Sequence, residues 1–186
     1  MYIGTQGRFP EDHDLEMLAQ LGVNNIDTTP SEPLAEWTAD LLTGYRERCA
    51  KYGIELEMMH LIGSGSALKD EVTGAIFLKP SDERERQLDL VCDVIRMAGK
   101  VGLRGFNYNI TILGHMRTES STGRGGAELS TFVFDKLDHS MGEFEQGAAD
   151  TDTMFERIGY WLQKVIPVAE EYKVQMGCHP SDPGIG

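Results

Sequence analysis

The sequence predicts an α/β protein built on a parallel (β/α) barrel of the TIM type, of which about five strands and four helices are present. Short apolar segments alternate with longer amphipathic ones along all 186 residues, in the order βαβαβαβαβ. The first turn after a strand, Gly4-Thr5-Gln6-Gly7, lacks the G-x-G-x-x-G pattern of dinucleotide-binding sheets, which favours a barrel over an open doubly wound sheet. Because a complete barrel takes about 250 residues, we expect residues 1–186 to be the N-terminal portion of one barrel domain.

The spacing of the apolar residues places the individual elements. The strongest helical repeat lies between Ser81 and Gly102, where Leu88, Val91 and Ile95 share one side of the predicted helix. The predicted helices are residues 12–21, 31–52, 81–101 and 151–172. The predicted strands are residues 2–5, 25–28, 54–61, 105–110 and 174–178.

Two connections that follow predicted strands are unusually long. Residues 62–80 and 111–150 both far exceed the roughly 2–6 residues of an ordinary βα loop, and loops of such length are usually functional or disordered. Both follow strands, so they lie on the face of the barrel that carries the chemistry. We expect residues 111–150 to cover the mouth of a site there, and residues 123–126, Gly-Arg-Gly-Gly, to form a turn.

Charge and cysteine content limit the partners and the compartment. The net charge is −13, from 30 acidic and 17 basic residues without a Lys/Arg cluster, which predicts no nucleic-acid or anionic-membrane partner. No apolar run approaches the roughly 18–20 residues of a membrane span, and the N-terminal residues do not form a signal-peptide pattern. Cys49, Cys92 and Cys178 are odd in number and far apart, so we expect buried free thiols and a cytoplasmic location.

His179 is the strongest candidate for a functional residue. It follows the last predicted strand in a His-Pro-Ser-Asp-Pro turn, where α/β barrels hold their catalytic groups. An imidazole commonly binds Mn²⁺, Fe²⁺ or Zn²⁺, so we expect His179 to be a metal ligand; the alternative is a structural histidine. Cys178 points to the opposite face of the strand, and we expect it to be buried against a helix. Ser181 and Asp182 either shape the turn or orient the imidazole through a hydrogen bond.

Polar residues near the ends of two other predicted strands are weaker candidates. Asn107 and Asn109 alternate with aromatic residues, so one face of that strand is polar and its amides need partners. His60 ends the third strand on the same side of the barrel, although a hydrogen-bonded core histidine is an equally good interpretation. Glu55 and Glu57 share a strand face, and buried carboxylates need partners, so at least one should face a polar interior or a cation.

The 111–150 connection carries further basic side chains. Arg117 offers a planar fork that suits a substrate carboxylate, although a charge on a long loop is also expected to be solvated. His115 and Arg124 have the same two interpretations, and for them the solvated one is favoured.

Three segments are similar to a known family. The first is VIPVAEE at residues 165–171, which places a proline inside a helix, and the second is MGCHPSDP at residues 176–183. The third is Tyr108-Asn109 followed by Arg117-Thr118. In these segments the chain resembles the N-terminal part of the mannonate dehydratase family, within the xylose-isomerase-like barrels. Ser181 departs from the family pattern, which usually has Asp at that point of a His-Pro-Asp-Asp-Pro turn.

The resemblance implies a carbon–oxygen lyase that removes water from D-mannonate to give 2-dehydro-3-deoxy-D-gluconate, with Mn²⁺ or Fe²⁺ as cofactor. Loss of the proton beside the substrate carboxylate requires stabilisation of an enediolate, which a divalent metal provides as a Lewis acid. The resemblance implies that His179 holds the metal and that Asn109 and Arg117 bind the substrate. We expect His115 to bind the substrate with them and Asp182 to orient His179. In the family the remaining metal ligands come from later strands.

Two alternatives remain open from the sequence. One is a metal-dependent sugar isomerase or epimerase of the same superfamily, which would use the same barrel. The other is a catalytically incomplete fragment whose first and last strands are open edges, so that copies of the chain associate as aggregates or as a homo-oligomer. Every interpretation except the fragment requires a small-molecule sugar or sugar-acid substrate.

Overall fold

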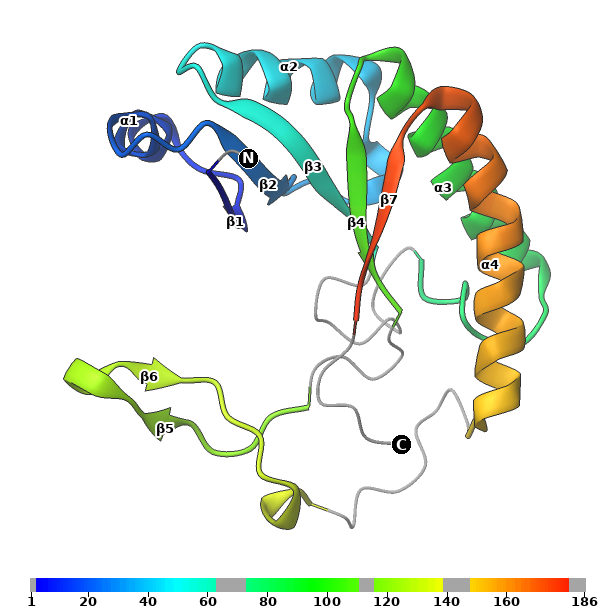
Figure 1. Cartoon of the computed structure of the whole chain (residues 1–186). Coiled ribbons are helices and arrows are strands. Elements are labelled where there is room, and N and C mark those ends of the chain that lie inside the picture. The colour runs from blue at the N-terminus through cyan, green and yellow to red at the C-terminus, as the bar shows by residue number, and fades with distance from the viewer. Residues whose placement is uncertain (1–2, 63–72, 111–115, 139–147, 181–186) are drawn as a thin grey trace.

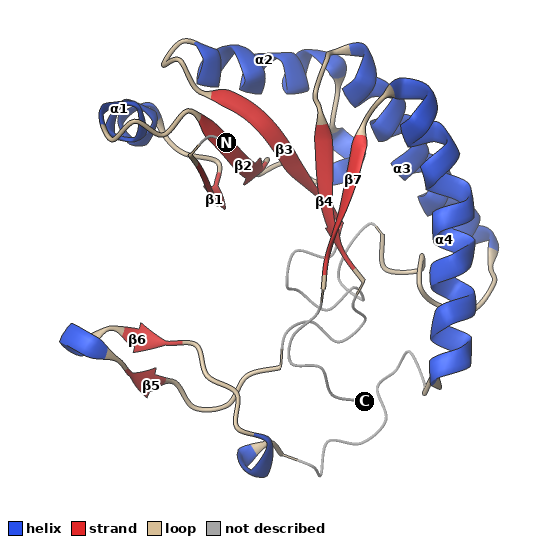
Figure 2. Ribbon diagram, viewed as in Figure 1, coloured by secondary structure: helices blue, strands red, loops and turns tan. Residues whose placement is uncertain are grey.

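The computed structural model describes residues 3–62, 73–110, 116–138 and 148–180. Its centre is a five-stranded sheet in which the strands pair in chain order, β1-β2-β3-β4-β7, and every pair is parallel. Figures 1 and 2 show the helices on the outer side of this sheet. Sequential parallel strands with outer helices are the pattern of a barrel, and a doubly wound sheet would reverse its strand order. The predicted fold class is therefore confirmed.

The sheet and its helices have these bounds. The strands are β1 (Gly4–Arg8), β2 (Asn25–Thr29), β3 (Glu55–Ile62), β4 (Gly105–Asn109) and β7 (Gln175–His179). The α-helices of the described residues are α1 (Asp12–Gln20), α2 (Ala39–Ala50), α3 (Asp82–Lys100) and α4 (Thr151–Tyr172).

Most predicted elements agree with the structure, and the first strand is shifted. It was expected at residues 2–5 but lies at Gly4–Arg8, because its backbone pairs with β2 from Gly4 opposite Asn25 to Arg8 opposite Thr29. Backbone pairing with a neighbouring strand therefore defines this element, and the apolar run at residues 2–5 does not.

The predicted helix over residues 31–52 is wrong in its first third. Only a single 3₁₀ turn forms at Leu34–Glu36, and α2 begins after Thr38, whose hydroxyl accepts a hydrogen bond from the amide of Leu41 at 3.1 Å. Between them Trp37 is extended, with its indole buried and donating to the carbonyl of Glu32 at 2.9 Å. Burial of this large ring beneath the sheet outweighs the helical tendency of the segment.

The long connection after β4 contains a small hairpin that the sequence analysis did not predict. Strands β5 (Ser121–Thr122) and β6 (Glu128–Leu129) pair antiparallel across the expected Gly-Arg-Gly-Gly turn. Gly125 and Gly126 have φ of 70° and 81°, a left-handed conformation that glycine adopts without strain. Figure 1 shows the hairpin standing away from the five-stranded sheet. A covering role for this connection stays a prediction, because residues 111–115 and 139–147 lie outside the described residues.

The core lies between the sheet and the helices. Trp161 of α4 is fully buried at its centre, with its ring 5.7 Å from those of Phe77 and Tyr108. Phe106, on the same face of β4 as Tyr108, lies 6.3 Å from the ring of Trp37. Burial of aromatic surface of this extent contributes more to stability than any other contact of the outer face.

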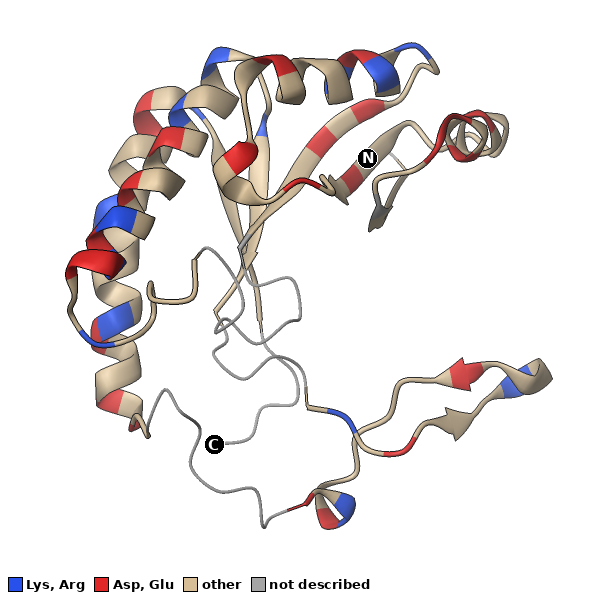
Figure 3. Cartoon of the chain, turned by 180° about the vertical axis from the view of Figure 1, so that it is seen from behind, with Lys and Arg blue, Asp and Glu red and all other residues tan. Residues whose placement is uncertain are grey.

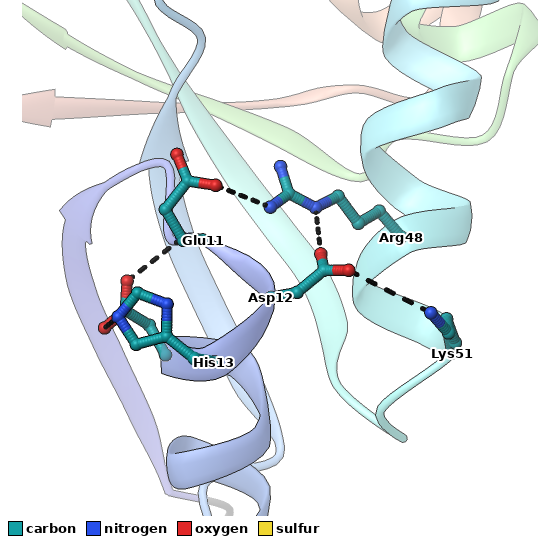
Figure 4. Close-up of polar contacts among 6 residues, drawn as sticks. Glu11, Asp12, His13, Arg48 and Lys51 are labelled. Carbon is teal, nitrogen blue, oxygen red and sulfur yellow. Dashed lines mark hydrogen bonds and ion pairs between the residues drawn. The ribbon is translucent and has the colours of Figure 1, made fainter.

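Ion pairs on the surface connect the first two helices. Arg48 of α2 donates to Asp12 at 2.6 Å and lies 3.4 Å from Glu11, while Lys51 is 4.0 Å from Asp12 (Figure 4). Hydrogen bonding to Arg48 holds the pKa of the Asp12 carboxyl below its usual range. Exposed pairs of this kind contribute little to stability, so burial of Leu15 is the more effective anchor of α1.

Charge and hydropathy in the structure match the composition. Figure 3 shows acidic positions on the helices and also on β2 and β3, with Lys and Arg positions interspersed among them along the described ribbon. Within the same residues no helix is both long enough and apolar enough to cross a membrane.

The close contact between α3 and α4 gives the first prediction. A Cβ on Gly99 would lie 2.6 Å from the carbonyl oxygen and 2.7 Å from the Cβ of Tyr172. We expect Gly99→Ala to lower the free energy of unfolding by about 1–2 kcal/mol, because overpacking exceeds the gain in helix propensity. Urea denaturation measures this change in the free energy of unfolding, provided that the m-value of the variant equals that of the wild type.

Gly44 is the matched control, since it lies inside α2 and an added Cβ meets no atom within 4 Å. Gly44→Ala should stabilise the protein by roughly 0.5–1 kcal/mol. Equal stability of the two variants would show that α3 and α4 are not in tight contact at residue 99.

Candidate functional site

The face of the sheet opposite the helices is polar. Along β4, Phe106 and Tyr108 pack toward the helices, so Asn107 and Asn109 point to the open face. The same alternation places His179 on the open face of β7 and Cys178 on the other. An aliphatic face would leave no donors or acceptors here, whereas this one can bind a polar ligand.

Three of these side chains form a hydrogen-bonded row at the C-terminal ends of adjacent strands. The Nδ2 of Asn109 lies 3.1 Å from Nδ1 of His179 and 3.3 Å from its carbonyl oxygen. The Oδ1 of Asn109 lies 3.0 Å from Nε2 of His60 on β3. Asn109 is only 2% exposed, while His179 is exposed. A buried amide therefore joins two imidazoles and leaves one of them open to a ligand.

The orientation of this amide decides which nitrogen of His179 is free to bind a metal. If the amide nitrogen faces His179, Nδ1 is the acceptor and a neutral ring carries its proton on Nε2. If the amide oxygen faces His179, Nδ1 carries the proton and Nε2 presents a lone pair to solvent. His60 accommodates both states, because its Nε2 can donate to the oxygen or accept from the nitrogen of Asn109.

A second polar network crosses the same face closer to the first strand. Asp27 of β2 accepts hydrogen bonds at Oδ2 from Gln6 and from Asn107, both at 3.3 Å. Its other oxygen, Oδ1, is buried without a hydrogen-bond partner among the described residues. The sequence analysis did not single out Asp27 or Gln6; the alternation of Asn25, Asp27 and Thr29 with buried residues was the available signal.

The paired glutamates of β3 lie at the other end of the strands. Arg104, just before β4, approaches Glu55 through Nε and Glu57 through Nη1, each at 3.7 Å. Parallel strands place this cluster near their N-terminal ends, away from Asn109 and His179. The partner of both glutamates is thus the guanidinium of Arg104, and a cation was one of the two partners expected for them.

Arg117 is not brought together with the row of imidazoles. Its Nε donates to the hydroxyl of Ser130 at 2.8 Å and its Nη1 to the carbonyl of Met116 at 2.8 Å, so the side chain is held by its own segment. Arg124 lies exposed in the hairpin turn. His115, Ser181 and Asp182 lie outside the described residues.

The expected burial of Cys178 is wrong. Its thiol is exposed, because β7 is the last strand of the described sheet and no neighbour covers its outer edge. It does lie on the face opposite His179, beside Tyr108, whose pKa is raised chiefly by burial. Cys49 and Cys92 are buried free thiols as expected.

The residues described here supply one open metal ligand. They contain no group of three or more His, Cys, Asp or Glu side chains that could hold a metal ion. Nε2 of His179 makes no contact with any of these residues, and its ring is fixed from behind by Asn109. A metal-binding histidine usually donates its second ring N–H to an oxygen, a role that the side-chain oxygen of Asn109 fills when the amide is turned toward Nδ1 of His179.

Comparison with known proteins points to one family. A profile described as D-mannonate dehydratase (UxuA) matches residues 125–186, which include His179 and the helix that precedes it.

The chain is similar to mannonate dehydratases. It is 25% identical to the enzyme of Thermotoga petrophila over 213 aligned positions, covering 94% of this chain and 57% of that one. It is 26% identical to the enzyme of Enterococcus faecalis over 179 positions, covering 77% and 48%. The chain therefore spans about half the length of the curated relatives it matches.

Solved structures agree on the fold. The mannonate dehydratase of Streptococcus suis serotype 2 superposes on 100% of this chain with a TM-score of 0.81 at 20% identity, and the match covers 54% of that enzyme. The D-psicose 3-epimerase of Clostridium cellulolyticum H10 superposes with a TM-score of 0.55 at 14% identity, over 95% of this chain and 51% of the epimerase. At these identities the matches establish the fold, a parallel α/β barrel. The similarity to mannonate dehydratases that was stated from the sequence is confirmed by the profile and by the curated relatives.

The differing exposure of the three thiols gives a prediction. Burial raises the pKa of the Cys49 thiol to about 11 and also raises that of Cys92, so neither forms a reactive thiolate near neutral pH. A disulfide reagent such as DTNB should therefore modify one thiol of the folded protein rapidly, and Cys178→Ser should remove that fast phase. A fast phase that persists in Cys178→Ser would contradict the exposed position of Cys178.

Proposed function

We propose that this chain contributes one side of the active site of a metal-dependent sugar-acid dehydratase, which converts D-mannonate to 2-dehydro-3-deoxy-D-gluconate and water. One observation carries the proposal. His179 stands open at the end of β7 with its inner nitrogen held by the buried Asn109, inside the segment that the dehydratase profile matches. The same barrel also serves sugar epimerases, but the similarity in sequence is to dehydratases.

His179 would hold the divalent ion, Mn²⁺ or Fe²⁺, through Nε2. An imidazole suits both ions, and the donor set found here fits them as one ligand of several. The bound ion would supply Lewis acidity beside the substrate carboxylate. The protein's own contribution at this point is geometric: Asn109 fixes the plane of the ring, and the orientation of its amide sets the tautomer that the ring presents.

The remaining residues of the proposal would orient the sugar acid. Arg117 suits the substrate carboxylate because its guanidinium binds two oxygens at once. In this structure it hydrogen-bonds Ser130 and Met116, so binding requires the hairpin segment to approach the sheet. We assign His115 to the same step and Asp182 to the orientation of His179, as expected from the sequence. Because Asn109 is buried, only the edge of its amide group would contact the substrate.

The metal assignment is tested by His179→Ala. The variant should lose high-affinity Mn²⁺ binding and dehydration of D-mannonate together, since the open ligand of this face is removed. Electron paramagnetic resonance of free Mn²⁺ measures the first, and release of the 2-keto acid measures the second. His13→Ala is the matched control, because His13 is exposed on α1 beside Asp14. If His179→Ala retains the Mn²⁺ affinity of His13→Ala, the assignment is wrong.

The role of the amide is tested by two substitutions at one position. Asn109→Asp keeps two acceptor oxygens, which favour the proton on Nδ1 of His179 and leave Nε2 for the metal, so Mn²⁺ affinity should be retained. Asn109→Leu removes the partner and should weaken Mn²⁺ binding by about 10–100-fold. Equal Mn²⁺ affinity in the Leu variant and the wild type would exclude a positioning role.

A further inference from the structure

A cavity of about 550 Å³ lies outside the sheet, between the first turns of α3 and α4. Its lining includes two guanidinium groups, Arg84 of α3 and Arg157 of α4, together with Thr153, Tyr160 and Gln163. None of these residues belongs to the hydrogen-bonded row of His60, Asn109 and His179 at the strand ends. The cavity therefore has to be explained separately from the proposed active site.

Arg84 is the unusual member of this lining, because it is a cation that is only 7% exposed. Its guanidinium carbon stacks 4.2 Å from the centre of the Tyr160 ring, and its Nε donates to Glu85 at 3.3 Å. The two terminal amino groups donate to no residue that the structure describes. Neither terminal nitrogen is a fully buried atom without a partner, so both open into the cavity, where water or a ligand can accept their hydrogen bonds.

The surroundings of Arg84 favour an anion as the missing acceptor. Among the described residues Arg157 donates through Nη1 alone, to the carbonyl of Phe77 at 3.1 Å, which leaves its other donors without a partner there. Thr153 and Gln163 add neutral donors. The amides of the two helix ends are already capped, so the side chains would provide the binding. The carboxylate of Glu156 also lines the cavity and that of Glu85 accepts from Arg84, but the three cations of Arg84, Arg157 and Lys164 outnumber these two carboxylates.

We propose that this cavity binds a small organic anion that carries a carboxylate or a phosphate group. A guanidinium with two free amino groups matches either oxyanion as a bidentate fork. The volume lies within the roughly 300–1,000 Å³ of small-molecule sites, so an inorganic ion alone would leave most of it empty. A sugar acid and a sugar phosphate share this chemistry, and direct binding measurements distinguish them.

Calorimetric titration with four probes, on metal-free protein from which the chelator has been removed, tests the proposal without any metal-dependent step. The probes are D-gluconate, glucose 6-phosphate, inorganic phosphate and glucose. We expect one of the two organic anions to bind at least tenfold more tightly than inorganic phosphate, and glucose not to bind. Absence of binding by both organic anions would overturn the proposal, and so would inorganic phosphate binding as tightly as they do.

Two substitutions locate the bound anion. Gly159 lines the cavity on the α4 face that also carries Glu156, Tyr160 and Gln163, and an added Cβ there meets no atom within 4 Å. Gly159→Leu should fill the cavity and abolish binding while keeping the helix stable. Gly44→Leu makes the same change in α2, where the added Cβ is equally free, and should bind like the wild type. Unchanged binding in Gly159→Leu would place the anion elsewhere.

Arg84→Lys tests the fork itself, because lysine retains the charge but offers a single donor group. Binding of the organic anion should weaken at least tenfold, with circular dichroism confirming that the variant is folded. Wild-type affinity in a folded Arg84→Lys protein would overturn the role of Arg84. Because no divalent metal is present throughout, these outcomes are independent of whether the dehydratase proposal is correct.

Discussion

The alternation of side chains along β4 is the constraint on which both the core and the site depend. Phe106 and Tyr108 point outward and pack against Trp37 and Trp161, which fixes the strand against the helices. Asn109 then has to point to the open face, where it lies between two imidazoles. A shift of this strand by one residue would exchange the two sets and destroy both at once.

The relative weight of the contacts follows from burial. Replacing a buried aromatic ring such as Trp161 by alanine typically costs about 3–5 kcal/mol, whereas the exposed ion pairs between α1 and α2 contribute little. The outer layer is therefore held by apolar packing, with Gly99 allowing α3 and α4 to approach closely. The polar contacts of the open face position side chains for binding and contribute less to the stability of the fold.

Local patterns in the sequence were sufficient for the elements with strong signals. The repeat between Ser81 and Gly102 predicted α3 to within a residue at each end, and the apolar run before His179 placed that side chain at a strand end. What failed depended on contacts between distant segments. Burial of Trp37 against Phe106 breaks the predicted helix, and the edge position of β7 exposes Cys178. The hydrogen bonds of Asp27 with Gln6 and Asn107 join side chains from three different strands. A local sequence pattern cannot predict such contacts.

The central claim is that His179 binds the metal through Nε2 while Asn109 holds Nδ1. A crystal structure with Mn²⁺, using the anomalous signal of manganese, tests it most directly. The account predicts a manganese peak at coordination distance from Nε2 of His179, with the amide of Asn109 still bridging His179 and His60. A manganese peak that makes no contact with His179, or an Asn109 turned away from both imidazoles, would contradict it.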